Sequence, residues 1–239
     1  AALADAVALL RACRRVAERV GLSFHVGSQC LDPAAYERAL DLAGQVIAAS
    51  GVDIDLLDVG GGFPVSYPHV EPPPLDDFLA AIARGVARLD LPPHCRLWCE
   101  PGRALVAPGQ SVVVQIVARR EGVLFLNDGV YGSLSDAGSA VGFRFPMRAI
   151  RADGGASVGE LADYILFGPT CDSADRLSGL YRLPADLRDG DWIEIGQLGA
   201  YGTALRTGFN GFDQATLVEV RDRPLLETPG YLPTVEQAA

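Results

Sequence analysis

The first hundred residues alternate between helical and strand patterns, and this alternation most strongly limits the fold of the chain. Apolar residues at helical spacing predict three helices, at residues 3–20, 32–51 and 75–89. Short apolar runs predict three strands between and after them, at residues 22–26, 54–59 and 96–100. This order predicts parallel strands joined by helical crossovers.

The second half of the chain has a different pattern. Short β-type runs, separated by Gly, Asp and Pro, lie at residues 111–117, 123–126, 164–167, 191–195 and 216–220. Helical periodicity is almost absent there. The sequence therefore predicts an α/β domain over residues 1–109 and an all-β domain over residues 110–239.

Composition narrows the classes of partner. The formal net charge is -10 and the pI is near 4.7, which argues against nucleic acid or an anionic membrane as partner. No apolar run has the length of a membrane span, and no secretory leader opens the chain. Five irregularly spaced cysteines are typical of reduced thiols. We expect a cytoplasmic protein.

Polar and glycine residues follow each predicted strand of the first half, where α/β folds place their sites. His25 follows the first strand, although a lone histidine is more often a loop or core residue. Three glycines, Gly60–Gly62, follow the second; they form either a phosphate cradle or a tight turn. Glu100 and Arg103 close the third strand, where a local ion pair is the simpler interpretation.

A thiol and a carboxylate stand side by side after a strand of the second half. Cys171 is a candidate acid or nucleophile there, and Asp172 a candidate ligand for a cation. The simpler alternative is a buried thiol next to a turn-forming aspartate. His94, Cys95 and Cys99 lack the spacing of a zinc site, so we predict no metal and assign them to the core.

The motifs are specific when taken together and in order. They are HVGSQ (25–29), DVGGGFP (58–64), EPGR (100–103), NDGVYGS (127–133), GPTCDSAD (168–175), GAYG (199–202) and FNGF (209–212). Over nearly the whole chain this series resembles the fold-type III pyridoxal phosphate (PLP) decarboxylases of ornithine, diaminopimelate and arginine. The resemblance implies the C-terminal part of a (β/α)8 TIM-like barrel, followed by a β-sandwich or β-barrel domain.

The resemblance also implies roles for individual residues at the cofactor. His25 would stack on the pyridine ring, and Glu100 would bind the ring nitrogen and keep it protonated, which favours the ring as an electron sink. The phosphate would be held by Ser28, Gly60, Gly61, Gly62, Arg103 and Tyr201.

At the substrate, the resemblance implies that Cys171 reprotonates the α-carbon and that Asp172 pairs with a distal amine, while Tyr131 and Phe209 contribute to the pocket. In the family the Cys-Asp pair acts across a homodimer interface. The Cys-Asp-Ser order at 171–173 favours ornithine, converted to putrescine for polyamine biosynthesis, over diaminopimelate. In the family a second acidic residue contacts the substrate, and its position falls on Ala140 in this chain. Asp136 is a candidate substitute. The identity of the substrate therefore stays open between ornithine, lysine and a related diamine precursor.

The chain contains no lysine, since all 20 basic side chains are arginine. PLP enzymes hold the cofactor as a Schiff base on a lysine, a bond that a permanently protonated guanidinium does not form. The resemblance implies that this lysine lies on an early barrel strand, and we expect this chain to be a fragment that lacks it. Alternatives are a non-catalytic regulatory homologue of the antizyme-inhibitor type and a fold-type III racemase; the Cys-Asp-Ser segment does not suit the racemase.

Overall fold

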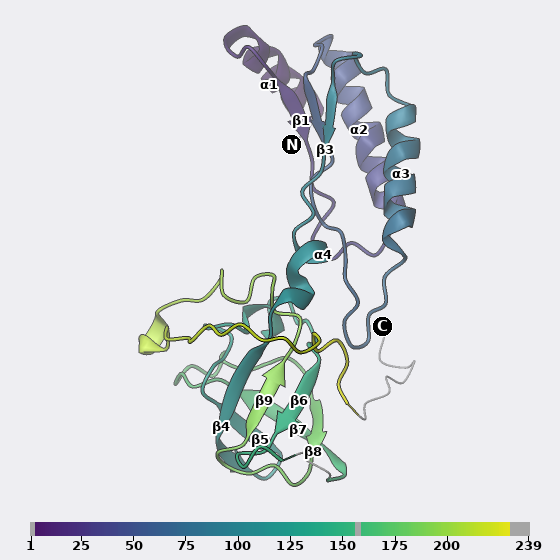
Figure 1. Cartoon of the computed structure of the whole chain (residues 1–239). Helices are drawn as coiled ribbons and strands as arrows, with labels where there is room; N and C mark the ends of the chain where they lie inside the picture. Colours follow the sequence, from purple (N-terminus) through teal and green to yellow (C-terminus); the bar gives the residue numbers. More distant parts are fainter. Residues whose placement is uncertain (1–2, 156–158, 230–239) are drawn as a thin grey trace. The chain divides into compact units, whose positions relative to one another are not determined.

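A computed structural model describes residues 3–155 and 159–229 of the chain (Figure 1). The chain forms two compact units. The first contains residues 1–65 and 72–105, and the second contains residues 66–71 and 106–239. Among the described residues, no helix combines the length and the apolar character that a membrane crossing requires.

The first unit is a parallel α/β layer, as predicted. Its strands are β1 (Gly21–Ser23), β2 (Leu56–Asp58) and β3 (Arg96–Trp98), hydrogen-bonded in the order β1-β2-β3. Its long helices are α1 (Leu3–Val16), α2 (Ala34–Ser50) and α3 (Leu75–Ala87). Both strand pairs are parallel, and the register aligns Ser23 with Asp58 and Asp58 with Trp98. The three strands therefore end at one level.

Helices α2 and α3 run side by side in this unit (Figure 1), and their buried faces form its core. Leu40 of α2 and Phe78 of α3 are fully buried, as is Leu57 of β2. Helix α2 ends where the sequence predicts, because Gly51 adopts the left-handed conformation with φ 63° and its N–H caps the carbonyl of Ile47.

The second unit is built on one six-stranded sheet. Its strands are β4 (Val112–Arg120), β5 (Val123–Leu126), β6 (Met147–Ile150), β7 (Leu161–Phe167), β8 (Tyr181–Pro184) and β9 (Trp192–Ile195). They pair in the order β6-β9-β4-β5-β7-β8, and only β5 and β7 are parallel. The two edge strands β6 and β8 approach each other, so the sheet curves towards a barrel. Its interior includes the fully buried Ile116, Leu124 and Leu166.

Several predicted elements differ from the structure. The strand predicted at residues 216–220 is wrong: the segment belongs to no strand, and Leu217 and Val218 are 73% and 75% exposed. An apolar β-type run needs a partner strand for its backbone groups, and none of the described strands pairs with it. The first helix ends at Val16 rather than near residue 20, and β6 and β8 were missed.

The structure has the predicted fold, a parallel α/β part followed by an all-β part. The boundary between residues 109 and 110 stays a prediction, because compactness alone does not show where an independently folding domain ends.

Candidate functional site

The three parallel strands bring the first group of predicted residues to one edge of the sheet. His25, Gly60 and Glu100 each lie two residues beyond the aligned strand ends Ser23, Asp58 and Trp98. Backbone hydrogen bonds continue the sheet past these ends, because Val59 N–H donates to the Trp98 carbonyl at 2.9 Å and Glu100 N–H donates to the Gly60 carbonyl at 2.8 Å. The backbone of Glu100 therefore lies next to the glycine turn, which also contacts His25.

The glycine turn has no room for side chains. Gly60 has φ +70°, and a Cβ there would lie 2.0 Å from the Phe24 carbonyl oxygen. Gly62 has φ +100°, and its Cβ would lie 2.4 Å from the Gly27 carbonyl oxygen. The three strand-end loops therefore pack backbone against backbone, which only glycine permits here.

His25 is fixed by this turn and remains exposed. The N–H of Gly61 donates to Nδ1 of His25 at 3.3 Å, so the neutral ring carries its proton on Nε2. Glu100 and Ser28 are also exposed. Arg103 differs, because it is only 6% exposed at the start of the short helix α4 (Arg103–Val106).

Tyr36 supports the turn from the core, a role that the sequence analysis missed. Its hydroxyl donates to the Gly61 carbonyl at 2.8 Å, and its fully buried ring stacks on Phe63 at 5.2 Å. Burial raises the pKa of Tyr36 well above its usual value, so the hydroxyl remains a donor. The only sequence signal was the place of Tyr36 on the apolar face of α2.

In the second unit, three predicted substrate residues converge from distant motifs. The hydroxyl of Tyr131 donates to Oδ2 of Asp172 at 2.5 Å, and the rings of Tyr131 and Phe209 lie 4.6 Å apart. Cys171 is exposed next to Asp172, and the side-chain amide of Asn210 donates to its Sγ at 3.6 Å. Thus the NDGVYGS, GPTCDSAD and FNGF segments form one cluster.

Asp175 joins two of these segments, and the sequence analysis missed it as well. This carboxylate is 1% exposed and accepts hydrogen bonds from the N–H of Val130 at 2.8 Å and from the N–H and hydroxyl of Thr170 at 3.0 and 2.8 Å. A Cβ on Gly129 or Gly168 would lie 2.1 or 2.2 Å from its Oδ1. The two glycines therefore make space for a buried carboxylate that holds both loops.

A buried ion pair fixes the other side of the Tyr131 loop. Arg206 donates to Asp128 and to Ser133, both at 2.6 Å, and the Arg206 and Asp128 side chains are each 12% exposed. Thr207, the next residue, donates through its N–H to the Tyr131 carbonyl at 2.9 Å. Residues 206–209 are thereby tied to the NDGVYGS loop.

The remaining predicted residues differ in exposure. Tyr201 belongs to the second unit, has φ +61° and is 44% exposed. Asp136 is 8% exposed inside a short 3-10 helix, and Ala140 is exposed. The assignment of His94 and Cys99 to the core is wrong, because the His94 side chain is 57% exposed and Cys99 is exposed too. Within residues 3–155 and 159–229, no group of three or more His, Cys, Asp or Glu has the arrangement of a metal site.

Two family models match the chain. One, described as the pyridoxal binding domain of pyridoxal-dependent decarboxylases, matches residues 1–107. The other, described as the C-terminal sheet domain of the same enzymes, matches residues 109–199.

Individual relatives agree with the family models. Ornithine decarboxylase of Schizosaccharomyces pombe is 34% identical over 215 residues, covering 83% of this chain and 47% of that protein. Diaminopimelate decarboxylase of Actinosynnema pretiosum is 35% identical over 229 residues, covering 89% of this chain and 50% of that protein. The chain thus spans about half the length of the curated relatives it matches.

The fold agrees as well. The crystal structure of lysine/ornithine decarboxylase from Vibrio vulnificus, complexed with cadaverine, superposes with a TM-score of 0.76 at 34% identity, covering 92% of this chain and 60% of that one. Motif order, fold and both matched models lead to the same conclusion: this chain belongs to the family of pyridoxal-dependent decarboxylases.

Proposed function

We propose that this chain is part of a PLP-dependent decarboxylase that converts a basic amino acid, most specifically L-ornithine, to the corresponding diamine. The alignment of His25, the glycine turn and Glu100 at one edge of the parallel sheet carries this proposal. These residues fit the cofactor, because a glycine turn has no side chain to keep a phosphate away from its backbone and an exposed imidazole offers its face to a planar ring.

Each residue has a proposed task. Ser28, Gly60–Gly62, Arg103 and Tyr201 bind the phosphate, His25 stacks on the ring, and Glu100 holds a proton at the ring nitrogen. When bound, a cofactor with a protonated ring would supply an electron sink for the pair left on the α-carbon by the loss of CO2. Cys171 then donates the proton of its Sγ to that carbon.

The proposed preference for a basic substrate rests on Asp172. Its carboxylate is oriented by the hydrogen bond from Tyr131, and that bond helps to hold the pKa of Asp172 below its usual value. A fixed negative charge attracts the distal ammonium of ornithine or lysine and repels the second carboxylate of diaminopimelate. This charge favours ornithine or lysine over diaminopimelate, and the Cys-Asp-Ser order at 171–173 is our ground for ornithine, with the Tyr131 and Phe209 rings lining the path of the aliphatic chain.

We also propose a homodimeric cytoplasmic enzyme in which Cys171 and Asp172 serve the partner's cofactor. Mixing two inactive variants of the protein translated from the longer reading frame, Glu100→Ala and Cys171→Ala, would then restore up to about a quarter of the activity, because mixed dimers hold one site without either substitution. Activity that stays at the level of the separate variants would contradict the shared site.

The activity itself is tested by reading and expressing the coding sequence together with its continuation upstream of Ala1. We expect a lysine at a strand end there and CO2 release from carboxyl-labelled ornithine, faster than from lysine or diaminopimelate. Asp172→Asn should lose activity with ornithine while PLP still binds. If the upstream half-barrel offers no lysine at a strand end, the enzyme proposal fails and a regulatory homologue takes its place.

A further inference from the structure

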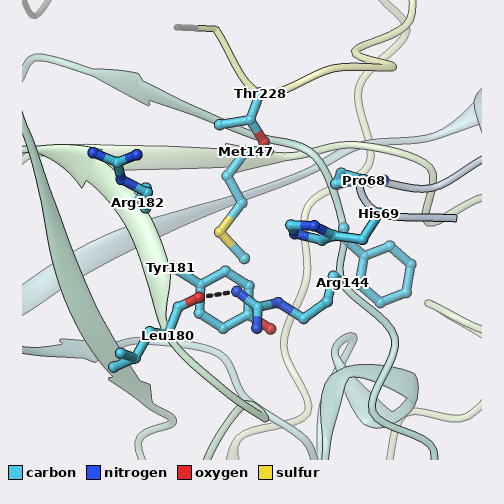
Figure 2. Close-up of a pocket in the computed structure, with 9 residues that line it drawn as sticks. Pro68, His69, Arg144, Met147, Leu180, Tyr181, Arg182 and Thr228 are labelled. Atoms are coloured by element: carbon cyan, nitrogen blue, oxygen red, sulfur yellow. Dashed lines mark hydrogen bonds between the residues drawn. The ribbon is translucent and has the colours of Figure 1, made fainter. Parts of the chain in front are cut away.

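A second concave site lies in the all-β unit, among residues for which the decarboxylase proposal has no use. The segment 66–71 contributes His69 to one wall, and β6, β8 and the residues before them contribute Arg144, Met147 and Tyr181 (Figure 2). The free space lets the centre of a water-sized molecule move over about 30 Å³. A water needs only ~10–15 Å³ by this measure, so the cavity admits a ligand of several atoms.

The lining of the cavity is positively charged in an acidic chain. Among the described residues, Arg144 and Arg182 line it and no carboxylate does, although the net charge of the chain is -10. Arg182 also lies 3.7 Å from Asp163, outside the lining, so Arg144 is the cation without an anionic neighbour there. In the part of the chain that the structure describes, no carboxylate lies within 4.0 Å of the Arg144 guanidinium. A partly buried guanidinium is ordinarily paired with an anion.

Arg144 is held in place by its surroundings. It donates to the carbonyl of Leu180, and its guanidinium lies 4.2 Å from the centroid of the Tyr181 ring (Figure 2). Gly179 makes the approach possible, because a Cβ there would lie 2.1 Å from Nη1 of Arg144. The cation is therefore oriented before any ligand arrives.

Two buried donors of the residues around this cavity have no hydrogen-bond partner among the described residues. Among the described residues, neither Nε of Arg144 nor the hydroxyl of Tyr181 makes a hydrogen bond, and both atoms are buried. Tyr181 is 4% exposed, and burial raises its pKa to about 12, with Arg144 opposing the shift, so the hydroxyl keeps its proton at neutral pH. A buried donor without an acceptor costs free energy that a bound acceptor would recover.

His69 contributes a third polar group. Burial, and secondarily the charge of Arg144, lower the pKa of its imidazole, which favours the neutral ring. Figure 2 shows the imidazole of His69 and the guanidinium of Arg144 facing the same space, with the Tyr181 ring against the guanidinium.

We propose that this cavity binds a small oxyanion, a phosphate or a carboxylate, through the guanidinium of Arg144, with His69 and the buried hydroxyl of Tyr181 beside it. An oxyanion carries a charge opposite to that of Arg144, whereas a water molecule supplies acceptors but no charge. None of these three residues has a part in binding the cofactor or the substrate as proposed above.

Histidine resonances of the 239-residue chain provide the test, because its three histidines lie in different places. We expect inorganic phosphate at constant ionic strength to shift the His69 signal saturably and to raise its pKa, since a bound anion favours the imidazolium. Acetate in place of phosphate shows whether a carboxylate binds equally well, and chloride controls for general salt effects. His25 reports separately on the cofactor region.

Variants identify the donors. Tyr181→Phe keeps the ring beside Arg144 and removes only the hydroxyl, so we expect phosphate to bind about tenfold more weakly. Arg144→Gln should abolish the His69 response, and Arg120→Gln, an exposed arginine on β4, should leave it unchanged. A thermal unfolding transition like that of the parent chain verifies that each variant is folded.

Three results would overturn the inference: no saturable shift of His69 with either oxyanion, an equal shift with chloride, or unweakened binding by folded Tyr181→Phe and Arg144→Gln. The cavity would then hold only water. A phosphate response at His25 alone would also overturn it while leaving the decarboxylase proposal intact.

Discussion

The hydroxyl of Tyr131 donates a hydrogen bond of 2.5 Å to Oδ2 of Asp172, 41 residues further along the chain. This bond, and secondarily the N–H of Ala174, hold the pKa of Asp172 below its usual value, and the same contact raises the pKa of Tyr131. The carboxylate that we assign to the substrate amine is thus kept charged and oriented before any substrate binds.

Replacing Tyr131 with Phe should therefore raise the pKa of Asp172 towards its ordinary value, as measured by carboxyl-carbon NMR titration. Because the native pKa is the depressed one, the stabilisation by Asp172 is complete above its unfolded-state pKa and is lost as the pH falls through the folded-state pKa. Tyr131→Phe should reduce this acid-dependent loss. Phe209→Leu retains the hydroxyl and should leave the titration unchanged; equal shifts in both variants would contradict the assignment.

Gly60→Ala should strongly destabilise the first unit, because it combines φ +70° with a Cβ 2.0 Å from the Phe24 carbonyl oxygen. Gly51→Ala is the matched control: its φ is +63°, but nothing lies within 4 Å of its Cβ. We expect Gly51→Ala to lower the free energy of unfolding by about 1–2 kcal/mol. Gly60→Ala should lower it by at least ~2 kcal/mol more, because the backbone must move to make room for the Cβ. Denaturant unfolding measures both, and similar losses would show that the close approach is absent.

Tyr36→Phe should cost about 1–3 kcal/mol, because the carbonyl of Gly61 loses its buried donor. The ring and its stacking on Phe63 are retained, so the loss reports the hydrogen bond. Urea unfolding measures the cost, and the His25 resonance should move because Gly61 also contacts that ring. Tyr164→Phe, which removes a longer bond of 3.3 Å, should cost less.

Asp175→Ala should destabilise the second unit by about 3 kcal/mol, since it leaves the N–H of Val130 and both donors of Thr170 without their acceptor. Asp172→Ala, only three residues away, removes a half-buried carboxylate that accepts from the Tyr131 hydroxyl and the Ala174 N–H, and should change the unfolding free energy less. Equal effects on the urea midpoint would show that Asp175 does not hold the loops.

The chain as given should not bind PLP through a lysine, because it has none. After incubation with PLP and borohydride reduction, peptide mapping should locate any covalent label only at the α-amine of Ala1, and ornithine should release no CO2. Decarboxylation of ornithine by these 239 residues alone would refute the assignment of the covalent anchor to a lysine outside them.

The sequence by itself determined the architecture where patterns are local. Gly51 ended α2 as predicted, and the helix–strand alternation gave the parallel layer, because capping and apolar periodicity act within a few residues. The same reasoning failed at residues 216–220, where a β-type run forms no strand without a partner. It also missed β6 and β8, which are strands because neighbouring strands pair with them.

For the candidate site, too, some features could be predicted from the sequence and others depended on the tertiary structure. The motifs predicted site roles for His25, the three glycines, Glu100, Cys171 and Asp172, because the type and order of these residues can be read from the sequence. Only the tertiary structure decided that register brings His25, Gly60 and Glu100 to one level, that Tyr131 orients Asp172, and that Asp175 is the buried acceptor joining two loops. The physical reason is that each of these relationships depends on atoms tens of residues apart, whose distances are fixed by strand pairing and core packing and not by local sequence.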